Sequence, residues 1–147
     1  MLLDIDLLLQ FLHYQLILLK DLNAIHGGRV IEHMVGQEIL ASSFNIDHKL
    51  QWWPREQKHA MAEVDYLLTV EVKVIPVEVK AAATDTLRSL LMMMDLLPHP
   101  YAILFYAGKM SVNEVTTPGG KVIKLLNLPY ILAGSLNDYA VWLIQEN

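Results

Sequence analysis

Charged residues interrupt two strand-like apolar runs between residues 62 and 80, and their positions constrain the fold more than any other feature. The segment reads AEVDYLLTVEVKVIPVEVK. Its Val, Leu, Ile and Tyr content favours β-strands at about residues 62–70 and 73–80. On a strand, Glu78 and Lys80 point to the same face, whereas Val77 and Val79 point to the other. The sequence therefore places charge on one face of an otherwise core-like sheet.

A hairpin over these strands predicts which side chains meet. If residues 71–72 form a two-residue loop, Asp65 falls directly opposite Glu78. A four-residue loop keeps that pairing, whereas an odd-length loop would put the two carboxylates on opposite faces. Directly opposed side chains have Cβ atoms roughly 4.5–5.5 Å apart. The loop sequence VEVK is poor turn chemistry, because it offers no Gly or Asn for a tight primed turn.

Two carboxylates at this separation repel each other unless a proton or a cation lies between them. Mg²⁺, a hard cation that binds through carboxylates and keeps several waters, suits such a pair, and Mn²⁺ is the alternative. Lys80 would then stabilise a developing negative charge or position an attacking water. The other interpretation is that Glu78 and Lys80 lie on a solvated face and that Asp65 pairs with Lys80 or Arg55.

Composition limits the class of protein. The 147 residues suit one domain with a sizeable core, and 54% of them are hydrophobic. The absence of cysteine excludes disulfides and thiolate metal sites and suits the cytoplasm. The apolar stretch at residues 7–19 is too short and too polar to span a membrane, and it lacks the features of a signal peptide. We therefore expect a soluble cytoplasmic protein with no membrane partner.

The net charge of −5 limits the partners. Nucleic-acid-binding domains usually present a basic surface, because phosphate contacts supply much of the affinity. The basic residues of this chain are scattered. A nucleic-acid partner therefore requires a local patch or a second chain.

The order of elements predicts the fold class. Apolar patterning favours helices at residues 2–20, 29–43 and 87–97, a short strand ended by Pro54, and a buried strand at 101–107. A turn at TTPGGK, a short strand at VIKLL and a helical tail follow. The order helix–strand–strand–strand–helix–strand predicts an α/β fold with a mixed sheet flanked by helices.

Asp65, followed by Glu78-Val79-Lys80 at the end of the next strand, resembles the D…E-x-K signature of the PD-(D/E)XK, or restriction-endonuclease-like, superfamily. The preceding helix is also similar, since Gly28 is followed four residues later by Glu32. The resemblance implies a single nuclease-like domain over residues 1–147 with a restriction-endonuclease-like core. It implies that Asp65 and Glu78 hold Mg²⁺ or Mn²⁺, that Lys80 stabilises charge, and that Glu32 is an auxiliary acid.

A second resemblance is more specific. The segments GGRVIEHMVGQEILA, WWPREQKHAMAEVDYLL, VIPVEVKAA and LLNLPYILA are similar, in this order, to a family of unknown function that forms the C-terminal domain of many prokaryotic AAA-type ATPases. The similarity spans about residues 2–135. The chain departs from the family at Ala81-Ala82, where Ser-Gly is usual, and it has no phosphate-binding glycine-rich loop. It therefore resembles the nuclease-like half without the ATPase.

Two further residues compete for roles. Glu38 is a rival to Glu32 as the helix acid, because helical spacing projects it near the middle of the apolar stripe. The Gly-plus-four spacing favours Glu32. Arg55 would contact phosphate or clamp an acidic residue, or it would form an ion pair at the edge of the core.

Two functions follow from these patterns. The first is a metal-dependent nuclease that acts on nucleic-acid phosphodiesters. The second is a noncatalytic binding or regulatory module that docks on an AAA-type ATPase or another protein. The apolar segment at residues 2–19 further predicts a homodimer, unless the C-terminal helix covers it within one chain.

Overall fold

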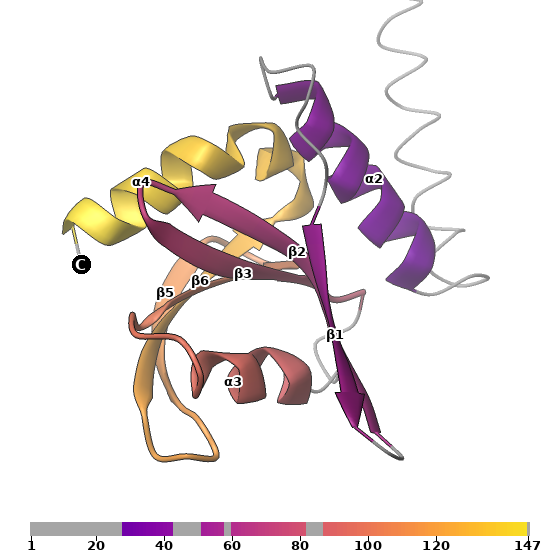
Figure 1. Cartoon of the computed structure of the whole chain (residues 1–147). Helices are drawn as coiled ribbons and strands as arrows, with labels where there is room; N and C mark the ends of the chain where they lie inside the picture. Colours follow the sequence, from indigo (N-terminus) through magenta and orange to yellow (C-terminus); the bar gives the residue numbers. More distant parts are fainter. Residues whose placement is uncertain (1–27, 43–50, 58–59, 82–86, 147) are drawn as a thin grey trace, which may run out of the picture.

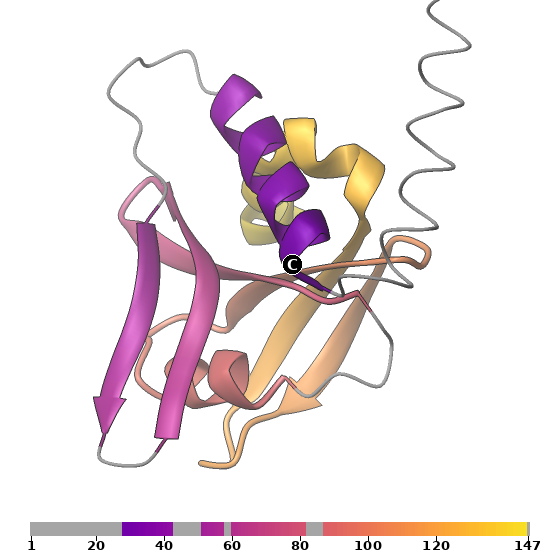
Figure 2. The same ribbon diagram turned by 90° about the vertical axis from the view of Figure 1, so that its right-hand side faces the viewer.

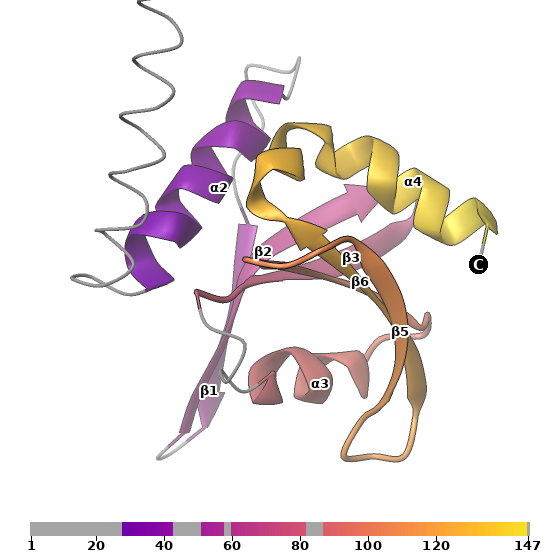
Figure 3. The same ribbon diagram turned by 180° about the vertical axis from the view of Figure 1, so that it is seen from behind.

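The computed structural model describes residues 28–42, 51–57, 60–81 and 87–146. A six-stranded sheet in the order β1-β2-β3-β4-β6-β5 forms the centre of the fold. Helices α2 and α4, with the 3-10 helix η1, cover one face of the sheet, and α3 covers the other (Figures 1 and 3). The expected mixed sheet flanked by helices is confirmed. The elements are α2 (Gly28–Ser42), β1 (Gln51–Gln57), β2 (Ala60–Val70), β3 (Lys73–Val79), α3 (Arg88–Met94), β4 (Tyr101–Tyr106), β5 (Ser111–Thr116), β6 (Val122–Pro129), η1 (Tyr130–Ser135) and α4 (Leu136–Glu146).

The central strands are parallel and the flanking strands are antiparallel. Strand β4 runs parallel to both β3 and β6, whereas the pairs β1–β2, β2–β3 and β5–β6 are antiparallel. Residues 102–105 of β4 are all buried, as the continuous apolar sequence predicted for a strand covered on both faces. The carboxyl ends of β3, β4 and β6 therefore point to the same edge of the sheet.

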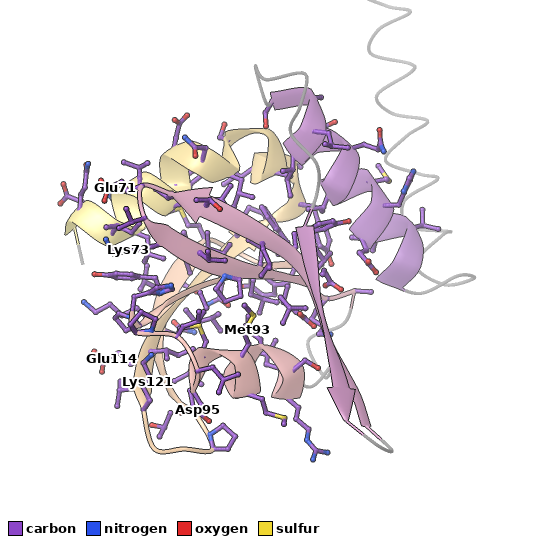
Figure 4. All side chains as sticks on the ribbon, in the orientation of Figure 1. Glu71, Lys73, Met93, Asp95, Glu114 and Lys121 are labelled. Carbon is purple, nitrogen blue, oxygen red and sulfur yellow. The ribbon has the colours of Figure 1, made fainter. Side chains whose placement is uncertain are left out.

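Two apolar clusters hold the layers together. The cluster under α2, η1 and α4 includes Ile31, Val35, Val77, Phe105 and Leu143. The cluster under α3 includes Val64, Leu90, Met93, Met94 and Leu104. Figure 4 shows Met93 between α3 and the sheet, so the methionine run contributes core packing as expected.

The hairpin β2–β3 has the predicted register. Val70 pairs with Lys73 across a two-residue loop, and the ladder continues to Tyr66 opposite Val77. Glu71 occupies the loop with a φ of 54°, in the left-handed region that non-glycine residues seldom adopt. The unfavourable turn sequence is therefore accommodated by one strained residue. Figure 4 shows Glu71 and Lys73 at the tip of this hairpin.

Two predicted boundaries were wrong, and one strand was not predicted. Pro54 does not end the first strand, because β1 is an edge strand, where a residue without an N–H is tolerated. Strand β5 was not predicted, since its exposed and half-buried polar residues lack the apolar pattern of a strand. The expected helical tail begins with the end of β6 and the 3-10 helix η1.

The predicted helix at residues 2–20 lies outside the described residues, as does the apolar segment behind the predicted homodimer. On α4, Tyr139 is half-buried against the core cluster under α2, η1 and α4, and Trp142 is 38% exposed. No helix in the described ranges is long and apolar enough to cross a membrane. The single domain over residues 1–147 stays a prediction.

Candidate functional site

Asp65 lies where β2 changes partners. Toward its start β2 pairs with β1, and toward its end it pairs with β3, so the strand bends between the two (Figure 1). The β1–β2 register shifts here, because Gln51 pairs with Leu67 but Trp53 pairs with Val64. Such bulges turn a strand and redirect its side chains. The last β2–β3 pair is Tyr66 with Val77, so the next step in register places Asp65 opposite Glu78.

The Asp65 carboxylate accepts a backbone hydrogen bond from β3, as the carbonyl of a neighbouring strand would do in a regular sheet. Its Oδ2 atom accepts a hydrogen bond from the Val79 N–H at 2.7 Å. A carboxylate held by a backbone donor keeps a fixed orientation. Asp65 is therefore positioned by β3 itself, at the point where the two strands separate.

Glu78 is a buried carboxylate with one engaged oxygen. Its side chain is 4% exposed, and its Oε1 atom lies 2.6 Å from the Lys80 Nζ atom. Its Oε2 atom is the one buried side-chain nitrogen or oxygen in the described ranges that has no hydrogen-bond partner. A buried polar atom without a partner costs roughly 1–3 kcal/mol, so it often marks a functional position. The expectation of a solvated face is wrong for Glu78.

The environment of Glu78 opposes its negative charge. The pKa of Glu78 is raised from 4.5 to about 7, first by burial and then by the negative charge of Asp65. The hydrogen bond and positive charge of Lys80, and a hydrogen bond with the Asp65 backbone, act in the opposite direction but do not cancel the increase. The carboxylate pair therefore favours any added positive charge, whether a proton or a cation.

Lys80 is held through its backbone as well as its side chain. Its N–H donates to the Phe105 carbonyl on β4 at 2.9 Å. Its own carbonyl accepts a hydrogen bond from the Tyr130 hydroxyl at the start of η1. The Lys80 side chain is 23% accessible, and its Nζ atom lies against the buried carboxylate of Glu78. Lys80 is thus fixed at both its backbone and its ammonium group.

Glu32 lies on the α2 side of the pair. The Tyr66 hydroxyl donates to the Glu32 carbonyl at 2.7 Å, which joins α2 to β2. Burial, followed by the negative charges of Glu32 and Asp65, raises the pKa of Tyr66 to about 12. Both carboxylates therefore act electrostatically on the same phenol. Glu32 is half-buried.

Glu38 faces another part of the fold. Glu38 is exposed, and its Oε2 atom lies 3.6 Å from the position that a β-carbon on Gly134 would occupy. It therefore faces η1, and the expectation that it projects near the middle of the apolar stripe was wrong. Arg55 lies on β1 opposite Ala62, and its side chain is outside the described part of the structure.

The donor set fits a hard divalent cation held by few protein ligands. Within the described ranges, no three His, Asp or Glu side chains gather as a metal cage. Magnesium commonly takes one or two carboxylates and completes its shell with water and substrate phosphate, so a pair is sufficient. The unpartnered Oε2 atom of Glu78 is the first candidate ligand, and the adjoining carboxylate of Asp65 is the second.

Sequence reasoning missed two tyrosines that support the site. Tyr66 connects β2 to α2, and Tyr130 connects η1 to Lys80. A buried tyrosine needs a partner for its hydroxyl, so a tyrosine beside a candidate acid is a usable signal. Nothing in the sequence indicates which carbonyl it contacts.

Comparison with known proteins gives one family. The sequence profile of a domain of unknown function, DUF4143, matches residues 27–131. This uncharacterised family is typically found with AAA-type ATPases. No curated protein matches the sequence. The matched range contains the carboxylate pair, Lys80 and Tyr130, whereas α4 lies beyond it.

Proposed function

The chain belongs to the DUF4143 domain family, and on that premise we propose that it is a metal-dependent phosphodiesterase acting on nucleic acid. In this proposal the sheet and its helices form a restriction-endonuclease-like core in the cytoplasm. The observation that carries the proposal is the buried Glu78 Oε2 atom, which has no hydrogen-bond partner among the described residues and lies beside a second carboxylate.

Asp65 and Glu78 would hold Mg²⁺ or Mn²⁺. When bound, the cation would supply an activated water and neutralise charge on the phosphate. Asp65 suits the role because the Val79 N–H fixes one of its oxygens. Glu78 suits it because burial and the neighbouring negative charge favour an added cation.

Lys80 and Glu32 would act on the substrate phosphate and on the attacking water, respectively. The ammonium of Lys80, on a side chain that is 23% accessible, would contact a phosphate oxygen and stabilise the charge that develops there. Glu32, near the same tyrosine as Asp65, would orient the attacking water or accept its proton. Tyr130 would keep Lys80 in place through the backbone.

A noncatalytic module is the second candidate, and the Glu78–Lys80 ion pair favours it. At 2.6 Å, Lys80 already neutralises one oxygen of Glu78 without any cation. In this alternative the domain docks on an AAA-type ATPase or another protein, as expected for a family found with such ATPases.

Two measurements on the full chain test the proposal. A native-state Mg²⁺ or Mn²⁺ site should raise the thermal unfolding midpoint by mass action, and Asp65→Asn should abolish the increase. Cleavage of single- and double-stranded DNA and RNA should require the metal and should fall at least about 100-fold in Asp65→Asn and Lys80→Ala. Glu71→Gln, an exposed acid at the tip of the same hairpin, is the matched control and should behave as wild type.

A metal-independent unfolding midpoint together with no cleavage above the Asp65→Asn background would refute the phosphodiesterase. That result would leave the noncatalytic module as the function that the fold supports.

A further inference from the structure

A row of four residues crosses the sheet from the carboxylate pair to its far edge. Glu78 on β3 is in register with Leu104 on β4, Leu104 with Asn127 on β6, and Asn127 with Ser111 on β5. Residues in register on neighbouring strands point to the same face. Strands are about 4.8 Å apart, so the row extends roughly 14 Å from β3 to β5. Glu78 and Asn127 are thus about 10 Å apart at their backbones.

The row lies near the carboxyl ends of the three parallel strands. Figure 2 views the fold from the side on which these strands end, with β1 and β2 on one side and β5 on the other. In open α/β sheets, ligands bind outside the carboxyl ends of parallel strands. Leu104 is 8% exposed and is the apolar residue that separates Glu78 from Asn127 in the row.

Asn127 is a polar residue at a position that is otherwise apolar. It is 6% exposed, and Ile123 and Leu125, which precede it on the same face, belong to the core under α3. Its Nδ2 atom donates to the Ser111 hydroxyl at 3.1 Å and, at the limit of a hydrogen bond, to the Ser111 carbonyl at 3.5 Å. An apolar residue would complete the core here at lower cost.

The other buried polar residues in the described ranges, besides Glu78, are His99 and Thr117, and each connects separate elements of the fold. His99 contacts the Val74 carbonyl at 2.9 Å and the Tyr101 N–H at 3.3 Å. Thr117 donates to Asp95 and accepts from the Lys121 N–H, which fixes the turn between β5 and β6 to the end of α3. Figure 4 shows Asp95 and Lys121 together at this end of the molecule.

We propose that Asn127 and Ser111 form a phosphate-contacting subsite for a polynucleotide strand that crosses the ends of β3, β4 and β6. The inference rests on the proposed function, because it takes the carboxylate pair as the point of cleavage. Amide and hydroxyl groups are common phosphate ligands that fix the position of a nucleic-acid strand. The separation of the two ends requires a substrate that extends at least one nucleotide beyond the cleaved phosphate.

The test compares a polynucleotide with a minimal diester. Binding of a fluorescent single-stranded oligonucleotide is measured by anisotropy in a Glu78→Gln background, so that no turnover disturbs the equilibrium. Adding Asn127→Leu should weaken binding about tenfold, equivalent to about 1.4 kcal/mol. In the wild-type background, Asn127→Leu should leave cleavage of bis(p-nitrophenyl) phosphate unchanged and raise the KM for the oligonucleotide. Asn137→Leu, an exposed asparagine on α4, is the control and should change neither.

The outcomes separate this inference from the proposed function. Unchanged oligonucleotide affinity in Asn127→Leu, or an equal loss of activity on both substrates, would overturn the subsite and leave Asn127 as a structural support for β5. If Asn127→Leu does not fold, Ser111→Ala serves in its place with the same expected result. The wild type could also bind the oligonucleotide without cleaving it, and Asn127→Leu could weaken that binding. This result would refute the proposed phosphodiesterase and support the subsite.

Discussion

Replacement of Glu78 by glutamine should stabilise the fold at alkaline pH. Glutamine keeps the size and the hydrogen-bonding ends of the side chain but removes its charge. Glu78 is nearly completely buried beside Asp65, and its pKa rises from 4.5 to about 7. The native state therefore binds the Glu78 proton more tightly than the unfolded state does.

The sign and size follow from linkage. The stability that Glu78 contributes is fully present below about pH 4.5 and is lost as the pH rises through about 7. The difference between these pKa values corresponds to roughly 3 kcal/mol, at about 1.4 kcal/mol per pH unit. Glu78→Gln does not ionise, so its stability relative to wild type should be near zero at pH 4.5 and should increase by up to about 3 kcal/mol at pH 8. The pKa of about 7 already includes the favourable effect of Lys80, so the loss of this ion pair needs no separate correction.

Urea unfolding in EDTA at several pH values measures the effect. The free energy of unfolding of wild type should fall between pH 4.5 and 8 relative to that of the variant. Added Mg²⁺ should then stabilise wild type and leave Glu78→Gln unchanged. A variant that is equally destabilised at every pH would refute the reasoning, because the charged Glu78–Lys80 pair would then stabilise the fold rather than oppose it.

Three further changes test other contacts. Tyr130→Phe removes the hydroxyl that donates to the Lys80 carbonyl. The rate of cleavage should fall severalfold, and the Mg²⁺ affinity should stay unchanged. A lower Mg²⁺ affinity would contradict the idea that Tyr130 acts through Lys80. Burial opposes the positive charge of His99 and lowers its pKa from 6.5. The free energy of unfolding should therefore fall as the pH decreases below about 6.5. Urea titrations of His99→Gln should no longer show this pH dependence. Gly108→Ala should destabilise the fold by about 1–3 kcal/mol in the same assay, because the new β-carbon would lie 2.1 Å from ring atoms of Tyr106; wild-type stability would show that the ring moves freely.

The hairpin register could be predicted because it depends on local rules. Side chains alternate along a strand, and an even-numbered loop fixes which residues oppose one another. The Asp65–Glu78 opposition therefore followed from the sequence once the loop was placed at residues 71–72. The buried strand β4 followed in the same way from its uninterrupted apolar run.

The choice between Glu32 and Glu38 depended on packing that the helical pattern does not contain. Helical spacing projects Glu38 near the middle of the apolar stripe, but it does not show which elements cover that stripe. Helix α2 packs against η1, a segment about 100 residues later in the chain, and this leaves Glu38 exposed beside Gly134. Strand β5 was missed for a related reason, since its partner β6 rather than its own residues makes it a strand.

The β2–β3 hairpin, its register and the opposed pair of acids could be predicted from local rules, because side-chain alternation and loop length act over a few residues. The burial of Glu78, and the lack of a partner for its Oε2 atom among the described residues, depend on how the layers pack. The two tyrosine contacts that support the site join residues 34 and 50 positions apart. Burial and such contacts depend on how the helical layers cover the sheet, and no short stretch of sequence encodes that arrangement.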